Sequence, residues 1–553
     1  MDRNYRELFV RIFIGAFLIA SLGSLSACGG GGSSSPLPPS PPSAFSLASP
    51  ANTTPSLVIG TALSWQDSSG ETSYTLQISS DNFATTGYSY VDTSIPANTV
   101  SYTLTPGMLA GGVTYSWRVI AVNATGQTTA TNAPFSFTTR TETPVWSLFS
   151  NPTSSLDDEP YGMVISGSSM YVVGYDSDTA LGDDQWRIEN RDTSTGSLVA
   201  SFGTTTGVVV SNPSVASIFS FDDAYAIAVD STDMYVVGFD SVAGDDDWGW
   251  HIEKRDLVTG ASVTTFGTDG AISENLSIYV DEAFAVAVDS TQLYIVGYEE
   301  TLTQGAQWRI EARDKSTGSL VSEVTSSLSA DADYAYAIAI DPDEGYMYVA
   351  GSDASSGDWK WRIEKRTLSA PLSLETTTFG GGSGFVQSDL GVGVDEPFAI
   401  VMDKNAGYLY IAGYEQDTIN SRYRWRIEKR RMSDGALETA QFGGTTGFVV
   451  SSTTTNAVAN SIAIDSNYMY VAGYDNTSSG SFEWRIEKRD LTTGALVSSF
   501  GFGGVVVYDF GTPSAGFDDV ARAIAVDSTN VYVAGYETVS GADSRWRIMT
   551  LPK

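Results

Sequence analysis

The sequence predicts an all-β protein built mainly from one unit that occurs seven times. Three observations predict this fold class. A tryptophan recurs roughly every 60 residues, which lies in the range of propeller and solenoid repeats. Apolar and polar residues alternate within each unit, and the apolar runs are rich in Val, Ile, Tyr and Trp and bounded by turn residues. The tryptophans are Trp186, Trp250, Trp308, Trp361, Trp425, Trp484 and Trp546.

Each unit is expected to form four short antiparallel strands. In the second unit we predict them at residues 224–229, 234–239, 250–255 and 261–266. Four-stranded units arranged in a circle form a β-propeller, and closure of the circle protects the edges of the sheets. The expected architecture is a seven-bladed β-propeller over residues 141–553.

The two ends of the repeat region are expected to pair. The last unit ends after its third strand, at Trp546–Met549, and lacks an outermost strand. Val145–Phe149, ahead of the first unit, matches Leu496–Phe500, which we interpret as a fourth strand. We therefore predict that residues 145–149 pair with residues 546–549 and close the ring through backbone hydrogen bonds.

Residues 1–27 are predicted to be a targeting segment. Basic residues precede an apolar stretch, residues 12–22, that is short for a membrane span. Leu25-Ser-Ala-Cys28 resembles a bacterial lipobox, which implies cleavage before Cys28 and acylation of its thiol and new amino group; an ordinary secretory signal is the alternative. Gly29 after the cysteine implies an outer membrane lipoprotein, periplasmic or surface-exposed. Residues 28–43, rich in Gly, Ser and Pro, are expected to be a tether.

Residues 44–140 have a different pattern. Leu63-Ser-Trp65, Tyr74–Ile78, Tyr115-Ser-Trp-Arg-Val119 and Phe135–Thr139 alternate core and surface residues. This stretch resembles a fibronectin type III domain, an immunoglobulin-like β-sandwich. The resemblance implies a spacer or a module that contacts proteins or glycans. We expect Trp65 and Trp117 in its core.

The repeat region resembles the bacterial SBBP-type β-propeller repeats. Residues 399–413 carry the pattern, with Ala-Ile-Val-Met-Asp403, a turn that contains Gly407, and Tyr-Leu-Tyr-Ile-Ala-Gly413. The similarity covers about residues 156–549 and implies a fold without a single activity.

Composition restricts the partners. The chain has 30 basic and 65 acidic residues and a formal charge of −35, so nucleic acid and anionic membrane surfaces should be repelled. Contact with a membrane is expected through the lipid anchor alone. Cys28 is the only cysteine, and the only histidine, His251, stands where other units have Arg187 or Arg309. These counts exclude an intrachain disulfide and metal sites built on His or Cys.

Acidic residues recur at two loop positions in the repeats. If the Ala-rich strand is innermost, both loops lie on one face and form two concentric acidic rings, which we expect to bind a divalent cation such as calcium. The alternative is that these acids solvate the face and cap turns. The first position has Asp158, Glu159, Asp222, Asp223, Asp281, Glu282, Asp333, Asp395, Glu396 and Asp519, and the second has Asp176, Asp240, Glu299, Asp353, Glu415, Asp475 and Glu537.

Aromatic residues share the same face. One repeat position has Tyr161, Tyr225, Phe284, Tyr336 and Phe398, with Asn460 and Arg522 in the last two units. Aromatic rings beside carboxylates suit sugar binding, and packing between blades is the alternative. Because the last units depart from the pattern, we expect a ligand near that asymmetry.

The Trp-Arg-Ile-Glu-Lys-Arg strand has a structural interpretation. Alternation places Arg485, Glu487 and Arg489 on one face, where the glutamate can pair along the strand and the arginines can reach the next blade, at Asp465 or Asp527. Buried ion pairs of this kind fix register more than they add stability.

Two functions follow from the sequence. The first is a non-catalytic, lipid-anchored binding or scaffold protein that holds a protein or polysaccharide on a propeller face, with no catalytic residues and no cofactor other than calcium. The alternative is a carbohydrate-active enzyme that uses paired carboxylates.

Overall fold

The computed structural model describes residues 40–553 except 58–60, 85–87, 105–107, 110, 141–143, 151–155, 179–182, 214–220, 242–246, 303–304, 329–330, 355–357, 390, 392, 418–420, 452–455, 477–480, 511–516 and 541–542. The predicted signal peptide, Cys28 and the tether to residue 39 lie outside these residues. The described part is β-structure with two short 3₁₀ turns, η3 (Phe379–Gly382) and η4 (Phe442–Thr445). None of its helices is long and apolar enough to span a membrane.

The N-terminal region forms a sandwich of two sheets. One sheet has the order β1 (Leu47–Ser49), β3 (Ala62–Trp65), β6 (Ser101–Thr103). The other has the order β2 (Thr54–Leu57), β9 (Phe135–Thr139), β7 (Thr114–Asn123), β4 (Ser73–Ser79), β5 (Tyr90–Pro96), and β8 (Gly126–Thr129) pairs with β7. Trp65 and Trp117 are buried in the core between the sheets, as the sequence predicts.

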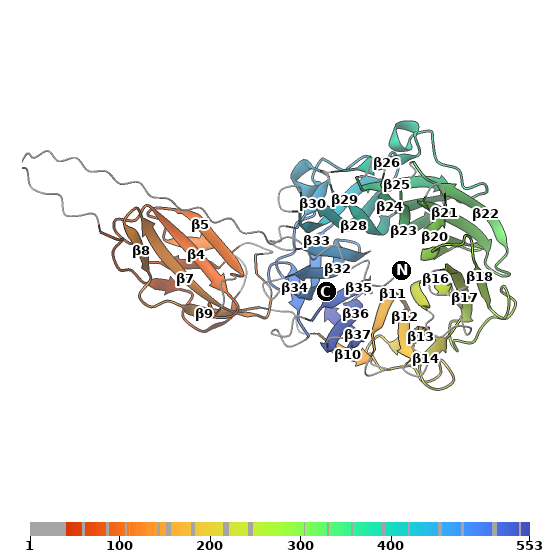
Figure 1. Ribbon diagram of the computed structural model, residues 1–553, viewed down its shortest axis with the longest axis horizontal. Helices are drawn as coiled ribbons and strands as arrows, with labels where there is room; N and C mark the ends of the chain where they lie inside the picture. The colour runs from red at the N-terminus through yellow and green to blue at the C-terminus, as the bar shows by residue number, and fades with distance from the viewer. Residues whose placement is uncertain are drawn as a thin grey trace, which may run out of the picture.

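The remaining strands in the described residues form seven four-stranded antiparallel sheets. Figure 1 shows them around a common centre, with the first strand of each sheet innermost and the fourth at the rim. Sheet 1 is β11 (Asp158–Ser166), β12 (Ser169–Asp178), β13 (Asp183–Asp192), β14 (Val208–Ser211); sheet 2 is β15 (Asp223–Val229), β16 (Asp233–Ser241), β17 (Trp248–Asp256), β18 (Ala271–Glu274); sheet 3 is β19 (Glu282–Val288), β20 (Gln292–Thr301), β21 (Gly305–Asp314), β22 (Leu320–Ser326). Sheet 4 is β23 (Asp333–Asp341), β24 (Tyr346–Asp353), β25 (Lys360–Thr367), β26 (Phe385–Ser388); sheet 5 is β27 (Glu396–Asp403), β28 (Tyr408–Gln416), β29 (Tyr423–Arg431), β30 (Phe448–Val450); sheet 6 is β31 (Ala457–Ile464), β32 (Tyr468–Asn476), β33 (Phe482–Asp490), β34 (Val505–Tyr508).

Sheet 7 contains both ends of the ring. Its order is β10 (Trp146–Ser150), β37 (Asp543–Pro552), β36 (Asn530–Ser540), β35 (Asp519–Val526). Trp146 pairs with Thr550 and Ser150 with Trp546, so the segment ahead of the first repeat supplies the fourth strand of the last sheet. The predicted pairing of residues 145–149 with the C-terminal strand is present.

The predicted position of the fourth strand in the second unit is wrong. In sheet 2 the strand is Ala271–Glu274, and residues 261–266 contribute only a bridge between Arg255 and Ser262. The reason is Phe266, whose side chain is fully buried in the core between sheets and therefore leaves the pairing direction. Gly267 and Gly270 follow with positive φ and reverse the chain before the strand begins. The match between 145–149 and 496–500 therefore compared a strand with a turn.

Tryptophan bonds join neighbouring sheets. In each sheet the third-strand Trp donates its indole N–H, at 3.0–3.1 Å, to a backbone carbonyl on the second strand of the next sheet. The pairs are Trp186 with Phe239, Trp250 with Tyr298, Trp308 with Ser352, Trp361 with Tyr414, Trp425 with Tyr474, Trp484 with Tyr536 and Trp546 with Tyr175. The last pair links sheet 7 to sheet 1.

The third strand also carries a buried ion-pair ladder. Glu428 has no exposed surface; it pairs with Arg426, lies 2.6 Å from Nε of Arg430, and accepts a hydrogen bond from Ser388 of the preceding sheet at 2.5 Å. The alternation predicted for this strand is confirmed.

The arginines of the ladder can reach a neighbouring sheet, since Arg313 of sheet 3 pairs with Glu274 of sheet 2, but the predicted partners Asp465 and Asp527 are wrong. Arg485 pairs within its own sheet, with Asp475 at 2.8 Å. Asp465 pairs with Lys553 at 2.9 Å, and Asp527 accepts a hydrogen bond from Tyr532 at 2.7 Å. Asp475, on the adjacent second strand, therefore neutralises Arg485 within its own sheet.

The sandwich packs against sheet 6, beside β34 in Figure 1. Phe502, in the turn before β34, is fully buried among the sandwich core residues, and Val113 of the sandwich packs on Val505 and Val507. Phe502 occupies the position of Thr268 in the sheet 2 turn. Sheet 6 therefore carries an apolar contact for the sandwich at a position where sheet 2 has a polar residue.

Candidate binding site on the inner strands

Every innermost strand skips one residue in its pairing with the second strand, at the same repeat position. A skipped residue of this kind is a β-bulge, which turns a side chain away from the regular alternation. The bulge residues are Tyr161, Tyr225, Phe284, Tyr336, Phe398, Asn460 and Arg522. All of them are half-buried.

A glycine on the second strand permits each bulge. A Cβ on Gly238 would collide with the backbone carbonyl of Asp223, and one on Gly297 would collide with that of Glu282. The glycine that ends the aromatic-Val-x-Gly pattern is therefore required by the close approach of the bulged strand. This glycine is the feature of the sequence that indicates the bulge.

Five of the bulge residues form an aromatic belt, defined as Tyr161, Tyr225, Phe284, Tyr336 and Phe398. Successive ring centroids are 5.0, 5.5, 5.3 and 5.1 Å apart, so each ring contacts the next. The structure thus brings together the aromatic residues that the sequence singled out. They pack between sheets, and each keeps part of its surface exposed.

The belt is interrupted at sheets 6 and 7. Asn460 donates its side-chain N–H to the backbone carbonyl of Ala521 at 2.8 Å. The Arg522 guanidinium pairs with Glu159 of sheet 1 at 3.0 Å and lies over the rings of Tyr161 and Tyr536, at 5.3 and 5.4 Å. Burial lowers the pKa of Arg522, but the charge of Glu159 outweighs it and the pKa is raised.

Glu396 forms a second polar point beside the belt. It accepts hydrogen bonds from the hydroxyls of Tyr336 and Tyr414, both at 2.6 Å. Burial, together with the charge of Glu396, holds the pKa of Tyr414 well above its ordinary value. The ring of Tyr414 lies 5.7 Å from that of Phe398, so this hydrogen-bonded group is continuous with the belt.

The first predicted acidic ring is not a surface feature. The carboxylates of Asp158, Asp222, Asp281, Asp333, Asp395 and Asp519 are buried and accept the backbone N–H of the residue at the end of the second strand, at 2.8–3.1 Å. They tie the first strand to the second, because a buried N–H needs an acceptor. Burial raises the pKa of Asp281 and Asp395 to about 6 and that of Asp519 to about 7. Asp223 and Glu282, next in sequence, are also buried.

The second acidic ring is neutralised by the third strand. Asp176 pairs with Arg187 at 3.2 Å and Glu299 with Arg309 at 2.7 Å. Asp240 lies 3.5 Å from Nδ1 of His251. Burial lowers the pKa of His251, but hydrogen bonds to Asp240 and Glu253 outweigh it and raise this pKa to about 9. The histidine is therefore a cation in the place of an arginine.

Cation binding gains no support from this arrangement. No group of three or more His, Cys, Asp and Glu that could hold a metal ion occurs within the residues that the structure describes. Most of the carboxylates predicted as calcium ligands have other partners: Asp158, Asp222, Asp281 and Asp395 accept backbone N–H groups, Glu159, Asp176 and Glu299 pair with arginines, Asp240 lies beside His251, and Glu396 accepts tyrosine hydroxyls. Calcium at the acidic rim stays a prediction.

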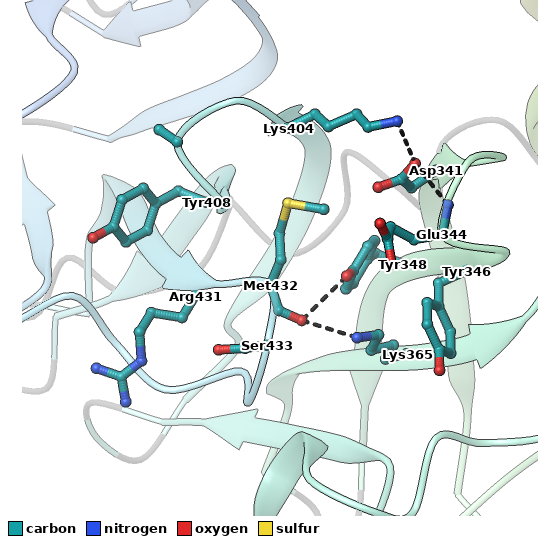
Figure 2. A pocket seen from close by; sticks show the side chains of 12 residues that line it. Asp341, Glu344, Tyr346, Tyr348, Lys365, Lys404, Tyr408, Arg431, Met432 and Ser433 are labelled. Atoms are coloured by element: carbon teal, nitrogen blue, oxygen red, sulfur yellow. Dashed lines mark hydrogen bonds and ion pairs between the residues drawn. The ribbon is translucent and has the colours of Figure 1, made fainter.

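A separate hollow of about 470 Å³ lies between sheets 4 and 5, at the turns that join first and second strands. Figure 2 shows Lys404 beside Asp341, and Lys365 reaching the Met432 carbonyl, 3.2 Å away. The Lys365 ammonium lies over the ring of Tyr346 at 4.2 Å, and Lys429 and Lys488 repeat that contact with Tyr408 and Tyr468. The arrangement is therefore a packing rule of the repeat.

No family model and no curated protein matches this chain. Similar solved structures include a quinohemoprotein alcohol dehydrogenase from Pseudomonas putida HK5 (11% identity, 74% of this chain and 76% of that chain, TM-score 0.36). Sqt1 from Chaetomium thermophilum is similar at 10% identity (74% and 98%, TM-score 0.37). The β-propeller domain of the Trilobed protease from Pyrococcus furiosus is similar at 9% identity (72% and 94%, TM-score 0.34). These similarities carry no argument about a ligand or an activity.

Proposed function

We propose that this protein is a non-catalytic binding protein of the bacterial outer membrane, anchored by lipid at Cys28. In this proposal a fibronectin type III-like sandwich precedes a seven-bladed, SBBP-like β-propeller, and a protein or polysaccharide ligand lies on the inner strands. The observation that carries the proposal is the aromatic belt: five half-exposed rings on bulges, beside Glu396 and the Arg522–Glu159 pair. Ring faces and carboxylates together offer apolar contact and hydrogen-bond acceptors.

The enzyme alternative is less well supported by the same geometry. A general acid needs a raised pKa and access to substrate. Asp395 and Asp519 have raised pKa values, but they are buried and their oxygens accept backbone N–H groups. Burial raises these pKa values and outweighs the backbone hydrogen bonds, which lower them, so the raised values need no catalytic role to explain them.

The test is a binding screen of the mature protein on glycan and peptide arrays, repeated with Phe284→Leu. Leucine keeps an apolar side chain and the net charge but removes the ring. The proposal expects at least one ligand whose binding is weakened in the variant, with no product formed on incubation. The proposal would be refuted if every ligand bound the Phe284→Leu variant as tightly as the unchanged protein, or if a bound glycan were converted to product. Mass spectrometry of the membrane form, compared with Cys28→Ser, tests the anchor.

A further inference from the structure

Arg522 shows what kind of group the inner strands accommodate. It occupies the bulge position of sheet 7, where sheets 1 to 5 have aromatic rings. Its guanidinium is held by one carboxylate, Glu159, and by the faces of two tyrosines, Tyr161 and Tyr536. Ring faces carry negative potential, and a cation placed over them is attracted. The chain's own cation thus marks an environment suited to a positive charge.

A related arrangement recurs at sheet 5, where tyrosine hydroxyls donate to the carboxylate. Glu396 stands two residues before the bulge residue Phe398, as Glu159 stands two residues before Tyr161. Glu159 receives the bulge residue of the preceding sheet, Arg522, and Glu396 likewise receives the hydroxyl of Tyr336. In this position a neutral hydroxyl takes the place of the guanidinium.

The charge of the belt favours a positive ligand. Carboxylates stand two residues before the bulge in sheets 1, 2, 3 and 5: Glu159 and Glu396 are half-buried, Asp223 and Glu282 are buried, and Arg522 is the cation among the bulge residues. The chain as a whole has a formal charge of −35, so a cationic ligand is also steered toward it at long range. An anionic polysaccharide would be repelled both by the carboxylates beside the belt and by the net charge of the chain.

We infer that the belt recognises guanidinium or ammonium groups, and that its ligand is a basic segment of a protein rather than a neutral polysaccharide. This inference rests on the proposed function and specifies its ligand. Arginine or lysine side chains lie on the belt faces, and Glu396, which accepts the hydroxyls of Tyr336 and Tyr414, neutralises one of them.

The experiment is calorimetric titration of the mature full chain with two probes, a hexa-arginine peptide and maltohexaose. The peptide is expected to bind, and Phe284→Leu, which leaves the charge unchanged, should weaken its Kd about tenfold, because cation–π contacts are lost. Phe398→Leu is a second variant, used if the first unfolds, and thermal melting checks both. Peptide binding that is equally tight in the belt variants overturns the inference, since it would reflect net charge alone.

A charge-matched pair completes the test. Glu396→Gln and Asp343→Asn each remove one negative charge, and Asp343 is exposed in the turn between β23 and β24, away from the belt. Only Glu396→Gln should weaken peptide binding; equal weakening by both overturns the inference. Absence of peptide binding together with belt-dependent binding of maltohexaose would overturn the inference and leave the proposed function standing. Absence of belt-dependent binding on the glycan and peptide arrays would remove the proposed function itself.

Discussion

The indole nitrogen of Trp546 lies 3.1 Å from the backbone carbonyl oxygen of Tyr175 and joins the last sheet of the ring to the first. Six equivalent bonds connect the other neighbouring sheets in the described residues. The tryptophan of the repeat is therefore an element of closure, and its regular spacing reflects this bond rather than a ligand.

Substitution of Trp546 by Phe should destabilise the ring. The change leaves the carbonyl of Tyr175 without its buried donor and removes part of a fully buried side chain, which together should lower the free energy of unfolding by about 2–4 kcal/mol. Chemical denaturation measures the loss. The control is Trp117→Phe in the sandwich, because the Trp117 indole N–H is buried with no hydrogen-bond partner in the described part of the chain. If the two variants lost the same free energy of unfolding, the hydrogen bond of Trp546 would not contribute to stability.

Substitution of Glu428 by Ala should be more severe. Arg426 and Arg430 would be left buried without their carboxylate, which costs about 3–5 kcal/mol. Interactions with these arginines outweigh burial and lower the pKa of Glu428 to about 2, so its stabilisation is present above pH 4.5 and is lost as the pH falls toward 2. Denaturation at neutral pH, with the exposed residue Glu344→Ala as control, measures the effect. A neutral result for Glu428→Ala would mean that the ladder is hydrated.

His251 should make the ring less stable at alkaline pH. Its pKa is raised from 6.5 to about 9, so the stabilisation is complete below pH 6.5 and is lost as the pH rises through 9. A shift of that size corresponds to at most about 3 kcal/mol. The interval from pH 7.5 to 9.5 lies above the pKa of Asp519, about 7, and includes that of His251. The His251→Arg variant has the residue that other sheets have at this position. Its melting temperature should change less with pH over this interval. Parallel curves for the two proteins would show that His251 is neutral.

Phe502 should control the attachment of the sandwich. Phe502→Thr introduces the residue type that sheet 2 has at this turn, so the ring keeps a repeat-compatible residue while the sandwich core loses a buried ring. Small-angle scattering should show a larger radius of gyration and proteolysis should be faster between the two parts. The matched control is Thr268→Ala, at the equivalent turn of sheet 2. Unchanged scattering of Phe502→Thr would mean that other contacts hold the sandwich.

The sequence could predict what depends on periodicity. Alternation correctly placed Arg485, Glu487 and Arg489 on one face. Because the last repeat lacks an outer strand in the sequence, the pairing of residues 145–149 with that repeat could also be predicted. Alternation failed for residues 261–266, because it cannot distinguish a paired strand from a turn that inserts Phe266 into the core.

The site was predicted only in part. The repeat position of the belt aromatics identified them in the sequence. The β-bulge on which they lie is indicated in the sequence only by the glycine on the paired second strand. The exposure of the acids was misjudged: Asp222 and Asp281 are charged residue types, yet each is buried to accept a backbone N–H, and no sequence pattern distinguishes that use from a solvated carboxylate.

Oxidative footprinting of the mature protein with its array-selected ligand tests the belt most directly. Ligand should protect Tyr225 and Tyr336, which are belt residues, and leave Tyr346 and Tyr408, which line the hollow of Figure 2, as reactive as before. Protection of the hollow with an unprotected belt would contradict a binding site on the inner strands.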